Sequence, residues 1–572
     1  MRLLVGPLLR RVSGDRATIW VETSEPATVE VRTGAPGATA GAACGPSAAG
    51  TGPAGTGAAG GAARTFTAFG HHYALVVVDG LPPGAVTPYQ VLLDGRAVWP
   101  AAGSPYPPSV IRTRPPGAPV RLVFGSCREA TSRASKRSYP PDALDSYAVR
   151  LARSADPLRD WPDSLLLLGD QVYADETSPR VRRWLRRRRR PRQVPSTQVV
   201  SFEEYTRLYL ESWTDPEIRW LLSTVPSVMI FDDHEIIDDW NTSASWRAEM
   251  RSQPWWRERI AGGLASYWVY QHLGNLDPDE LAADPVYAKV ASAGDATGLL
   301  HEFASRVEVE PDVGHDPLLW RQSEYRWSFA LDIGRTRVVV LDTRASRVLA
   351  PAHRAMLPAG EWQWLLDQLL HPLDGVDHLV VGTSLPWLMA PAVHHIEAWN
   401  ERLCGSPRRW VAGPAEGLRR WLDLEHWAAF GRSFEELSAV LGQVATGPSL
   451  ASLSVVSGDV HHSYVARADL GPDVRSPVHQ LTCSPLHNQL PAALRPVLRV
   501  GWGGTAAAAA RGLARLAGLR RPGVSWRRLA GPYFGNAVAT LVHNGRSAHV
   551  TIEGTDPRAG LQTVASVPLA SG

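Results

Sequence analysis

Four leucines at positions 165–168 lead directly into Gly169 and Asp170, and Tyr173 and Asp175 follow within the next five residues. A short apolar run that ends in Gly-Asp is typical of a buried strand whose carboxyl end leads into a polar loop. Open α/β sheets bind their ligands at this edge. Asp170 and Tyr173 are close enough in the chain to bind one metal ion, so this stretch predicts a strand that supplies metal ligands.

Three further apolar runs end in the same way. They cover residues 121–126, 228–231 and 453–457, and they lead into Cys127, Asp232-Asp233-His234-Glu235 and Gly458-Asp459-Val460-His461-His462-Ser463. Thiolate, carboxylate and imidazole are all metal ligands, and distant segments meet when strand ends converge on one crevice. By itself, a cysteine at the end of a buried strand is usually a small apolar side chain. The four runs together favour a metal centre.

In this order, the four motifs resemble the alkaline phosphatase D-like (PhoD-like) family of metallophosphatases. The resemblance is carried by Phe124-Gly125-Ser126-Cys127, Gly169-Asp170-Gln171-x-Tyr173-Ala174-Asp175, Asp232-Asp233-His234-Glu235 and Ser457-Gly458-Asp459-x-His461-His462-Ser463. Each motif is short, but four in order are specific, and the resemblance extends over nearly the whole chain. It implies a multi-domain fold, with an α/β catalytic domain in which a β-sandwich is flanked by helices.

Residues 1–115 are predicted to form a separate antiparallel β-sandwich of immunoglobulin-like type. Polar and apolar residues alternate, with turn residues between the runs, in segments 17–23, 27–32 and 73–78. Segment 34–63 is almost entirely Gly, Ala, Ser, Thr and Pro. It cannot bury enough apolar surface to offset its ordering entropy, so we predict a long flexible loop. A proline-rich linker, 114–119, then leads to the catalytic domain, 120–572.

Strands alternate with helices after residue 120, which favours α/β layering. We predict strands at 336–344, 377–387 and 478–483, a helix at 360–370, and an edge hairpin formed by 535–543 and 547–552. Segments 240–325 and 388–450 are predicted to be helical insertions that cover the crevice. We interpret Trp255-Trp256 and His394-His395, which lie in these insertions, as structural. Segment 505–521 is predicted to be an amphipathic surface helix, with membrane-surface attachment through its arginines as the alternative.

Composition indicates a globular protein of more than one core. The chain has 572 residues, 44% of them apolar, and 22 tryptophans. Its net charge of +3 hides a local excess, because nine arginines and no acid lie between Arg180 and Arg192, while 50 basic and 56 acidic residues make up the rest. Such a run is usually a solvated loop or helix. The alternative is contact with a polyanion such as nucleic acid or polyphosphate, or with an anionic membrane.

The cysteines and the N-terminus lead us to expect a cytoplasmic protein. Cys44, Cys127, Cys404 and Cys483 show no paired spacing, so a disulfide scaffold is not expected. The first eleven residues have an apolar patch that is interrupted by Gly and Pro, closed by Arg, and too short for a signal peptide. No window offers about 20 uninterrupted apolar residues, so no transmembrane segment is expected.

The donor types predict two kinds of metal site. In a metallophosphatase, two metals about 3.5–4 Å apart supply a metal-activated hydroxide and stabilise the leaving oxygen. Asp170 is our candidate for a bridging carboxylate. Cys127 and Tyr173 would add a thiolate and a phenolate on one side, which suits a ferric ion. Asp233 and Asp459 would serve the other side with oxygen ligands suited to calcium, magnesium or manganese.

The resemblance implies further roles. Asp233 stands where the wider superfamily has a metal-binding Asn, and His234 stands at the histidine that assists the leaving group. Asp459 replaces one histidine of the superfamily's Gly-His-x-His, and His461 keeps the other as a metal ligand. The family is known for one iron ion with calcium ions, so Fe³⁺ and Ca²⁺ are implied, with Mg²⁺ or Mn²⁺ as options in the second site.

Other charged side chains near the motifs have two interpretations each. Arg128 and Arg344 are candidates for bidentate phosphate contacts, or else structural arginines. A further group of carboxylates is expected either to orient the metal ligands or to bind calcium: Asp175, Asp232, Asp238 and Asp239. Because neighbouring side chains on a strand face opposite ways, only one of His461 and His462 is expected to bind metal.

The sequence therefore predicts a metal-dependent phosphoric ester hydrolase, a phosphomonoesterase or phosphodiesterase, in which His234 assists departure of the alcohol. The alternative is a protein that binds a polyanion or a membrane surface on the same scaffold, with structural metals. Activity that chelators abolish would favour the enzyme. Salt-sensitive binding that survives Asp170→Ala would favour the alternative.

Overall fold

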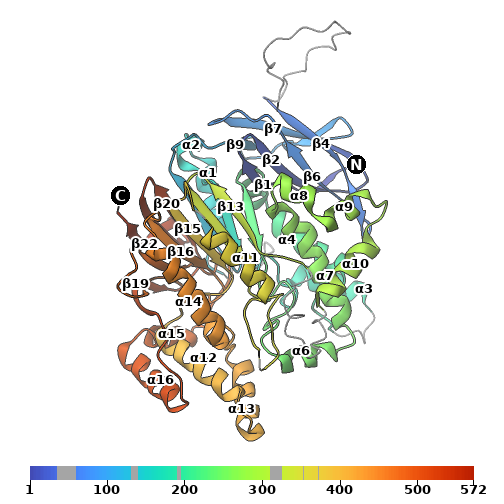
Figure 1. The fold of residues 1–572 in the computed structure, drawn as a ribbon. Helices are drawn as coiled ribbons and strands as arrows, with labels where there is room; N and C mark the ends of the chain where they lie inside the picture. Colours follow the sequence, from blue (N-terminus) through green and yellow to red (C-terminus); the bar gives the residue numbers. More distant parts are fainter. Residues whose placement is uncertain are drawn as a thin grey trace.

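The structure is a computed structural model that describes residues 1–34, 59–130, 139–189, 195–308, 325–351, 353–371 and 373–571. Most of the predicted loop 34–63, together with Cys44, Arg190 and Arg192, lies outside these residues. Two large sheets pack face to face, helices cover their outer faces, and two smaller sheets built from the first 112 residues lie at one end (Figure 1).

The first large sheet carries three of the four predicted motif strands. Its strand order is β12 (Ser227–Ile230), β11 (Ser164–Leu168), β10 (Val120–Gly125), β20 (Ala537–Asn544), β21 (Ser547–Asp556) and β22 (Gly560–Ala570). β10, β11 and β12 are parallel neighbours, so their carboxyl ends lie side by side. The predicted edge hairpin is wrong in its position, because β20 pairs with β10 and β22 adds one more strand beyond β21.

The second large sheet carries the fourth motif strand. Its order is β13 (Phe329–Ile333), β14 (Thr336–Leu341), β15 (His378–Thr383), β16 (Ser452–Ser457), β18 (Val478–Thr482), β17 (Ser463–Asp469) and β19 (Ser525–Tyr533). β14, β15, β16 and β18 are parallel neighbours. β16, which precedes Gly458, lies in the middle of the sheet. The motif strands are thus divided between two sheets.

The four leucines of β11 show how the layers are held together. Leu166 and Leu168 pack between the two large sheets, against partners such as Val340 and Val456. Leu165 and Leu167 face the opposite way, into the core beneath the helices. A strand buried on both faces needs this continuous apolar run, and each fully buried leucine contributes roughly 1.5–3 kcal/mol.

Helices cover the outer faces of both sheets. The core outside the first sheet takes residues from α1 (Ala143–Ala152), α4 (Phe202–Trp213), α5 (Pro216–Thr224) and α7 (Trp256–Tyr270). The core outside the second sheet takes residues from α11 (Ala359–Leu370) and α14 (Gly431–Thr446). α1 begins at Asp142, whose carboxylate accepts hydrogen bonds from the backbone N–H groups of Leu144 and Asp145.

The two predicted insertions are helical. The first contains α6 (Ala244–Arg251), α7, α8 (Pro278–Ala283), α9 (Pro285–Ser292) and α10 (Thr297–Glu308), and the second contains α12 (Pro391–Cys404), α13 (Arg409–Trp421) and α14. Trp256 is buried, and His394 packs against Phe434 and Trp526, so both have structural environments. α15 (Leu494–Gly501) and α16 (Gly504–Leu516) follow, and the helix predicted at 505–521 ends at Leu516.

The first 112 residues form two antiparallel sheets that share a core. One has the order β1 (Leu3–Ser13), β2 (Arg16–Thr23), β6 (His71–Val78) and β5 (Phe66–Ala68); the other has β4 (Gly60–Arg64), β3 (Thr28–Thr33), β7 (Val86–Leu93) and β8 (Arg96–Trp99), with β9 (Val110–Arg112) also on β7. The predicted loop is wrong at its end, because residues 60–63 belong to β4. A Cβ on Gly61 would lie 1.8 Å from the carbonyl oxygen of Val77, so the lack of a side chain permits this close approach.

The small sheets are tightly joined to the rest of the molecule. Arg10 on β1 is fully buried and donates hydrogen bonds to the carbonyl groups of Ser227, at 2.9 Å, and of Tyr270, at 2.9 Å. One apolar core also runs from β1, β2 and β6 into α4, α5 and α7. The predicted division into domains 1–115 and 120–572 therefore stays a proposal. Among the described residues, no helix is both long and apolar enough to span a bilayer.

Candidate metal centre

Glycines let the ends of the motif strands touch. A Cβ on Gly458 would lie 2.0 Å from the Oγ atom of Ser126, and a Cβ on Gly169, whose φ is +111°, would lie 2.6 Å from the Cβ atom of Asp232. Ser126 Oγ accepts a hydrogen bond from the backbone N–H of Asp459 at 2.9 Å. The Gly-Asp pairs of the motifs thus bring carboxylates from both large sheets to one place.

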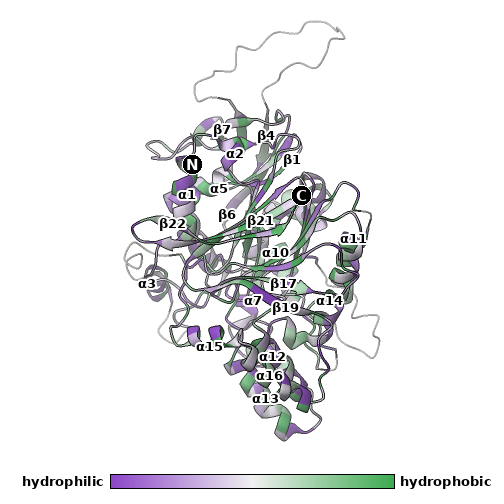
Figure 2. Cartoon of the chain, turned by 90° about the vertical axis from the view of Figure 1, so that its left-hand side faces the viewer, coloured by the Kyte–Doolittle hydropathy of each residue, from purple (hydrophilic) through white to green (hydrophobic). Residues whose placement is uncertain are grey.

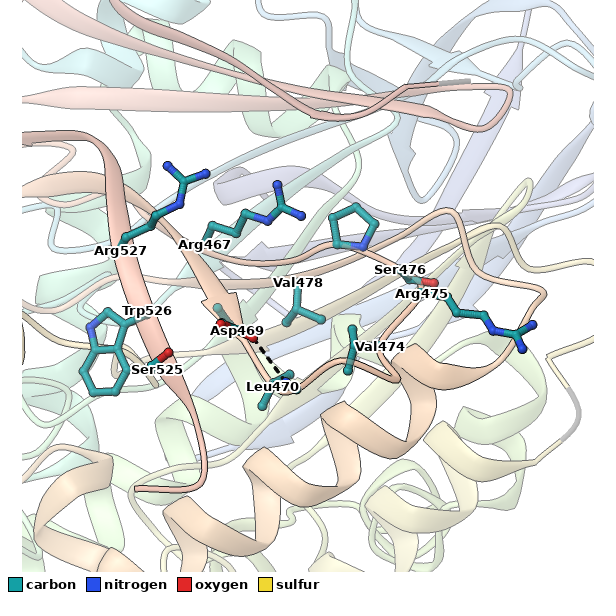
Figure 3. Close-up of a pocket in the computed structure, with 13 residues that line it drawn as sticks. Arg467, Asp469, Leu470, Val474, Arg475, Ser476, Val478, Ser525, Trp526 and Arg527 are labelled. Carbon is teal, nitrogen blue, oxygen red and sulfur yellow. Dashed lines mark hydrogen bonds between the residues drawn. The ribbon is translucent and has the colours of Figure 1, made fainter. Parts of the chain in front are cut away.

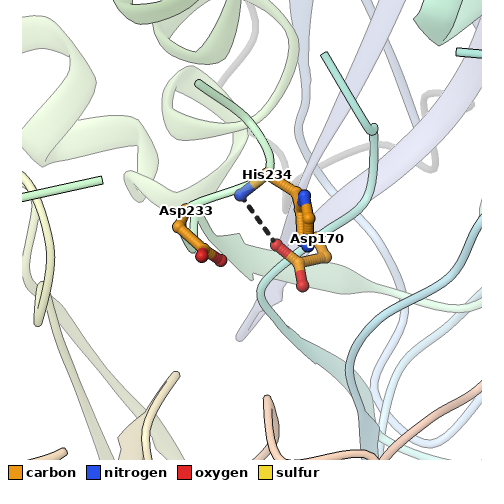
Figure 4. Close-up of side chains that lie close together, drawn as sticks. All are labelled: Asp170, Asp233 and His234. Atoms are coloured by element: carbon orange, nitrogen blue, oxygen red, sulfur yellow. Dashed lines mark hydrogen bonds between the residues drawn. The ribbon is translucent and has the colours of Figure 1, made fainter. Parts of the chain in front are cut away.

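Four carboxylates meet at these strand ends. Oxygen atoms of Asp170, Asp232, Asp233 and Asp459 all lie within 4.8 Å of one another. Asp170 and Asp233 also form a group with His234, whose backbone N–H donates to Asp170 at 3.3 Å (Figure 4). Burial raises the pKa of both Asp170 and Asp232 well above the ordinary value; the charges of neighbouring carboxylates add to this rise, and those of His234 and Arg344 oppose it.

The cluster fits a bound cation. Among the described residues, Oδ2 of Asp232 and Oδ1 of Asp233 are buried without a hydrogen-bond partner. Buried polar atoms are normally paired, and hard cations such as Ca²⁺ or Mg²⁺ bind carboxylate oxygens. Asp170, Asp233 and Asp459 were all predicted as metal ligands, whereas Asp232 was expected either to orient the metal ligands or to bind calcium.

The backbone around the cluster is strained. Nine non-glycine residues of the described chain have a positive φ, and seven of them lie in the loops around the centre: Cys127, Asp170, Asp239, Asn241, Asp423, Asp459 and His461. Each such residue costs of the order of 1–3 kcal/mol, and strain of this kind concentrates at functional sites. The loops are therefore held in shape by their surroundings.

Cys127 and Tyr173 border the cluster. The Sγ atom of Cys127 lies 3.0 Å from Ser126 Oγ and 3.3 Å from Ser484 Oγ, and the Tyr173 hydroxyl accepts a hydrogen bond from Asn488 at 2.9 Å. Burial and then the charge of Asp170 raise the pKa of both groups well above their ordinary values. Neither group belongs to the carboxylate cluster, and both would lose their protons only to a strongly Lewis-acidic cation.

The two neighbouring histidines have different surroundings. Burial lowers the pKa of His461 to about 4, so its imidazole is neutral, which is the form that binds metals. His462 is fully buried, its ring stacks on Tyr464 at 5.3 Å, and its Nδ1 lies 2.6 Å from the carbonyl oxygen of Val460. His462 thus packs as a core residue, and His461 remains the candidate ligand.

His234 is held by Asp175. Its Nδ1 lies 2.9 Å from Oδ1 of Asp175, and the ring of Tyr173 lies 4.6 Å away, centroid to centroid. Burial acts to lower the pKa of His234, but the charges of Asp175 and Asp233 raise it well above its ordinary value. The neighbouring carboxylates therefore favour the protonated form of the imidazole.

The two arginines that are candidates for phosphate contacts form ion pairs with acids. Arg344 is fully buried; its guanidinium bonds to Asp232 and lies 2.5 Å from Glu425, 3.6 Å from Asp233 and 3.8 Å from Asp459. It therefore neutralises the cluster from within the protein. Its Nη2 atom is buried between Asp233 and Asp459 without a hydrogen-bond partner, so the contact with phosphate stays a prediction beside the structural role.

Arg128 is occupied in the same way. It is 3% exposed, and its guanidinium lies 2.8 Å from Asp142 and donates to the carbonyl group of Ser212 at 3.0 Å. These bonds connect the strand end after β10 to the start of α1 and to α4. These contacts fit the structural interpretation of Arg128, and the contact with phosphate stays a prediction.

Comparison with known proteins places this constellation in a family. The family model described as PhoD-like phosphatase matches residues 148–494, more than half of the chain. The chain belongs to the PhoD-like phosphatase family. A second model, described as a domain of unknown function (DUF7800), matches residues 1–45 and 51–111. No curated protein matches this PhoD-like phosphatase.

Two solved structures resemble the PhoD-like phosphatase. One, titled "Structure of PhoD", is 14% identical with a TM-score of 0.54, and the match covers 100% of this chain and 93% of that one. The other, purple acid phosphatase PPD1 from yellow lupin (Lupinus luteus) seeds, is 11% identical with a TM-score of 0.48, covering 100% and 73%. The likeness to PhoD shows a shared fold, and the family predicted from the four motifs is confirmed.

The second helical insertion supplies residues of the PhoD-like centre that the motifs did not reveal. Glu425 accepts hydrogen bonds from Arg344 at 2.5 Å and Arg347 at 3.2 Å. His426 links Asp459, 3.2 Å from its Nε2, to Glu397, 2.8 Å from its Nδ1. The only sequence signal was a cluster of ligand-type residues, Asp423-x-Glu425-His426, with no apolar strand before it.

The carboxylates next to this insertion extend the acidic region. Burial, followed by the charges of Glu425 and Asp423, raises the pKa of Asp239 to about 9, and burial with the charge of Asp233 raises that of Asp238 to about 7.

A cavity of about 370 Å³ elsewhere on the PhoD-like phosphatase is lined by Arg467, Arg475 and Arg527 (Figure 3), and none of its lining residues belongs to the cluster.

Proposed function

We propose that this PhoD-like phosphatase hydrolyses phosphoric mono- or diesters with the help of bound metal ions. The observation that carries the proposal is the group of four carboxylates, with oxygen atoms within 4.8 Å of one another, beside His234, whose Nδ1 lies 2.9 Å from Asp175. So many buried acids in one place are costly unless cations bind them, and phosphate esters require cationic charge for attack by water.

The proposal assigns the metals by donor type. Cys127, Tyr173 and His461 would hold a ferric ion together with Asp170, and Asp233 and Asp459 would hold Ca²⁺, or Mg²⁺ or Mn²⁺, on the other side. When bound, the cations would neutralise the phosphate charge and make a water molecule more acidic. Asp170 lies in one cluster with Asp233 and Asp459, and the charge of Asp170 acts on both Cys127 and Tyr173, so it would be shared between the two sides.

The side chains around the metals complete the chemistry. Because Nδ1 of His234 is hydrogen-bonded to Asp175, Nε2 is the atom that would donate a proton to the departing alcohol oxygen. Arg344 balances the negative charge of the carboxylates. The cytoplasmic location expected from the sequence is also part of this proposal.

The test uses para-nitrophenyl phosphate and bis(para-nitrophenyl) phosphate as monoester and diester substrates. We expect hydrolysis that a chelator abolishes and that returned metal restores. Asp170→Asn should lower kcat by about a thousandfold or more, since removing a shared metal ligand removes transition-state charge stabilisation. Asp473→Asn, at an exposed position, is the control. Activity that survives both the chelator and Asp170→Asn would contradict the proposal.

The arginine-rich run favours a polyanionic partner as the second candidate. α3 (Pro179–Arg188) exposes six guanidinium groups: Arg180, Arg182, Arg183, Arg186, Arg187 and Arg188. Trp184 packs between the guanidinium groups of Arg188 and Arg207, at 5.1 and 5.0 Å from its ring. α3 begins four residues after Asp175, so a polyanion bound there would lie next to the proposed site.

Salt-dependent binding tests this candidate. Polyphosphate should bind with an affinity that falls steeply as salt rises, and reversing the charge of Arg182 and Arg186 should weaken binding. If Asp170→Asn still binds polyphosphate but no longer hydrolyses phosphate esters, α3 is a binding site of the enzyme. If binding persists and no hydrolysis occurs even in the native protein with metals, the alternative function, a polyanion-binding protein with structural metals, replaces the enzyme.

A further inference from the structure

The exposed large apolar side chains of this protein are concentrated at one end. Eleven are exposed among the described residues, and seven of them belong to α13, to α15 or α16, or to the residue after α13: Trp410, Trp421, Leu422, Leu494, Val497, Val500 and Leu516. These helices and α12 lie at the end opposite to the small N-terminal sheets (Figure 1 and Figure 2). Scattered exposed apolar residues are normal, but a concentration of them marks an interaction site.

α15 shows the pattern most clearly. Leu494, Val497 and Val500 are 46%, 61% and 62% exposed, and their spacing of three residues places them on one face of the helix. The end of the helix is anchored at Gly501, which is buried beside Ala390 and Val393 of α12. The exposed face of α15 therefore points away from the protein. Leu516, at the end of α16, is 88% exposed.

The same segment is strongly basic. Residues 494–521 contain six arginines and no acidic residue: Arg495, Arg499, Arg511, Arg515, Arg520 and Arg521. Within the part of the chain that the structure describes, none of the six forms a salt bridge with an acid. Arg499 lies over the ring of Phe534, 5.0 Å from its centroid. An apolar face bordered by unpaired cations is the composition of helices that lie in the interface of a bilayer.

We propose that the surface formed by α13, α15 and α16 docks on an anionic lipid bilayer. Val497, Val500, Leu494 and Leu516 would enter the boundary between headgroups and acyl chains, and the arginines would pair with lipid phosphates. Each cation near an anionic membrane surface adds to the attraction, and this contribution weakens with salt.

A second copy of the chain is the competing occupant, and the charge argues against it. In a two-fold dimer the same patch meets itself, so the arginines of one copy would face those of the other. Without acidic residues in segment 494–521 to offset them, these like charges would repel. An anionic lipid surface matches both the apolar and the basic character of the patch.

The docking surface is connected to the proposed metal centre. α12, on which α15 and α16 pack, carries Glu397, which lies 2.8 Å from His426 and through it contacts Asp459. α15 also begins six residues after Asn488, the hydrogen-bond donor to Tyr173. The surface is thus built into the catalytic part of the molecule. The inference does not depend on the proposed reaction.

The test is co-sedimentation of the full chain with vesicles. We expect binding to vesicles of phosphatidylglycerol mixed with phosphatidylcholine, and about tenfold weaker binding to phosphatidylcholine alone, where the charge attraction is absent. The double variant Val497→Asp/Val500→Asp should lose about tenfold or more in partitioning to anionic vesicles, because charged side chains cannot enter the apolar boundary. Arg511→Glu/Arg515→Glu should lose binding mainly at low salt.

Leu370→Asp is the matched control, since Leu370 is similarly exposed, at 42%, but lies on α11 outside the patch. It should bind vesicles as the native chain does. All variants should keep native circular dichroism and native hydrolysis of a small soluble phosphate ester. Equal binding to neutral and anionic vesicles, absence of binding to either, or a dimer in sedimentation equilibrium that Val497→Asp/Val500→Asp dissociates would each overturn the proposal.

Discussion

The Nε2 atom of His426 lies 3.2 Å from a carboxylate oxygen of Asp459, and the other ring nitrogen lies 2.8 Å from Glu397. His426 and Glu397 are both buried. This chain of contacts fixes the rotamer of Asp459, which comes from the second large sheet, against the helical insertion. A carboxylate that is oriented in this way loses less conformational entropy when it binds a metal than a carboxylate whose side chain rotates freely.

The first prediction follows from this chain. Glu397→Gln should lower metal affinity or kcat by about 10- to 100-fold with little change in KM, because the charge that holds His426 against Asp459 is lost. Metal titration followed by steady-state kinetics measures both effects. His395→Gln, two residues before Glu397 and on a different face of the same helix, is the control and should behave as the native protein. A change confined to thermal stability would contradict the positioning role.

The second prediction concerns the contact between the two large sheets. Gly458→Ala should destabilise the fold by about 1–3 kcal/mol or more, because the new Cβ would lie 2.0 Å from Ser126 Oγ and would force the strand ends apart. Gly512→Ala makes the same change on α16, where no atom lies within 4 Å. That control should gain up to about 1 kcal/mol from helix propensity. Equal melting temperatures of the two variants would refute the steric argument.

The third prediction separates the two kinds of metal. Protein purified without added metal should contain about one iron per chain if thiolate and phenolate donors act together. Cys127→Ser/Tyr173→Phe should lose this iron and retain calcium, whereas Cys404→Ser, on α12, should keep both. Elemental analysis provides the readout without any assay of activity. Zinc alone in the native protein, or iron that is unaffected by the double variant, would rule out the assignment.

The fourth prediction is a pH dependence of stability. His71 on β6 lies 2.8 Å from Glu22 and 2.9 Å from Glu203 on α4. Burial acts to lower its pKa, but the two glutamates raise it to about 9 from the ordinary 6.5. A raised pKa means that the folded state binds the proton more tightly, so the stabilisation is complete below about pH 6.5 and is lost as pH rises through about 9.

Thermal melting of the native chain and of His71→Asn measures this effect. Between about pH 6.5 and 9.5, the free energy of unfolding of the native chain should fall by about 1–2 kcal/mol relative to that of the variant. This value is smaller than the pKa shift of His71 alone would give, because water screens part of the interaction. Parallel melting curves for the two proteins over this range would show that His71 does not carry the proton.

The sequence identified the centre where a local pattern encodes it. The runs before Gly169 and Gly458 form strands. Asp170 and Asp233 meet because the parallel neighbours β11 and β12 end together, and Asp459 joins them from the facing sheet. Helix α11 and strands β14, β15 and β18 also form where the periodicity predicted them. In these segments the local pattern and the tertiary environment favour the same structure.

The remainder depended on tertiary partners that a sequence pattern does not reveal. Arg344 is a phosphate contact or a buried counter-ion according to what surrounds it, and Glu425, its partner, follows a helix without any strand motif. β4 forms from a Gly/Ala segment because it pairs with β3 while the backbone of β6 approaches Gly61, where a side chain would not fit. The position of the final hairpin was wrong because a further strand, β22, pairs with its outer side.

Asp170 and Asp233 follow strands of one large sheet, and Asp459 follows a strand of the other. The distance between these carboxylates therefore depends on the thickness of the layer of side chains that separates the two sheets. Leu168, immediately before Gly169, contributes to that layer, and a Cβ on Gly382 would lie 3.4 Å from it and 3.1 Å from Val340. Changes in the volume of such apolar residues would alter the size of ion that the carboxylates accept. Relatives could therefore diverge in metal preference while every ligand stays the same.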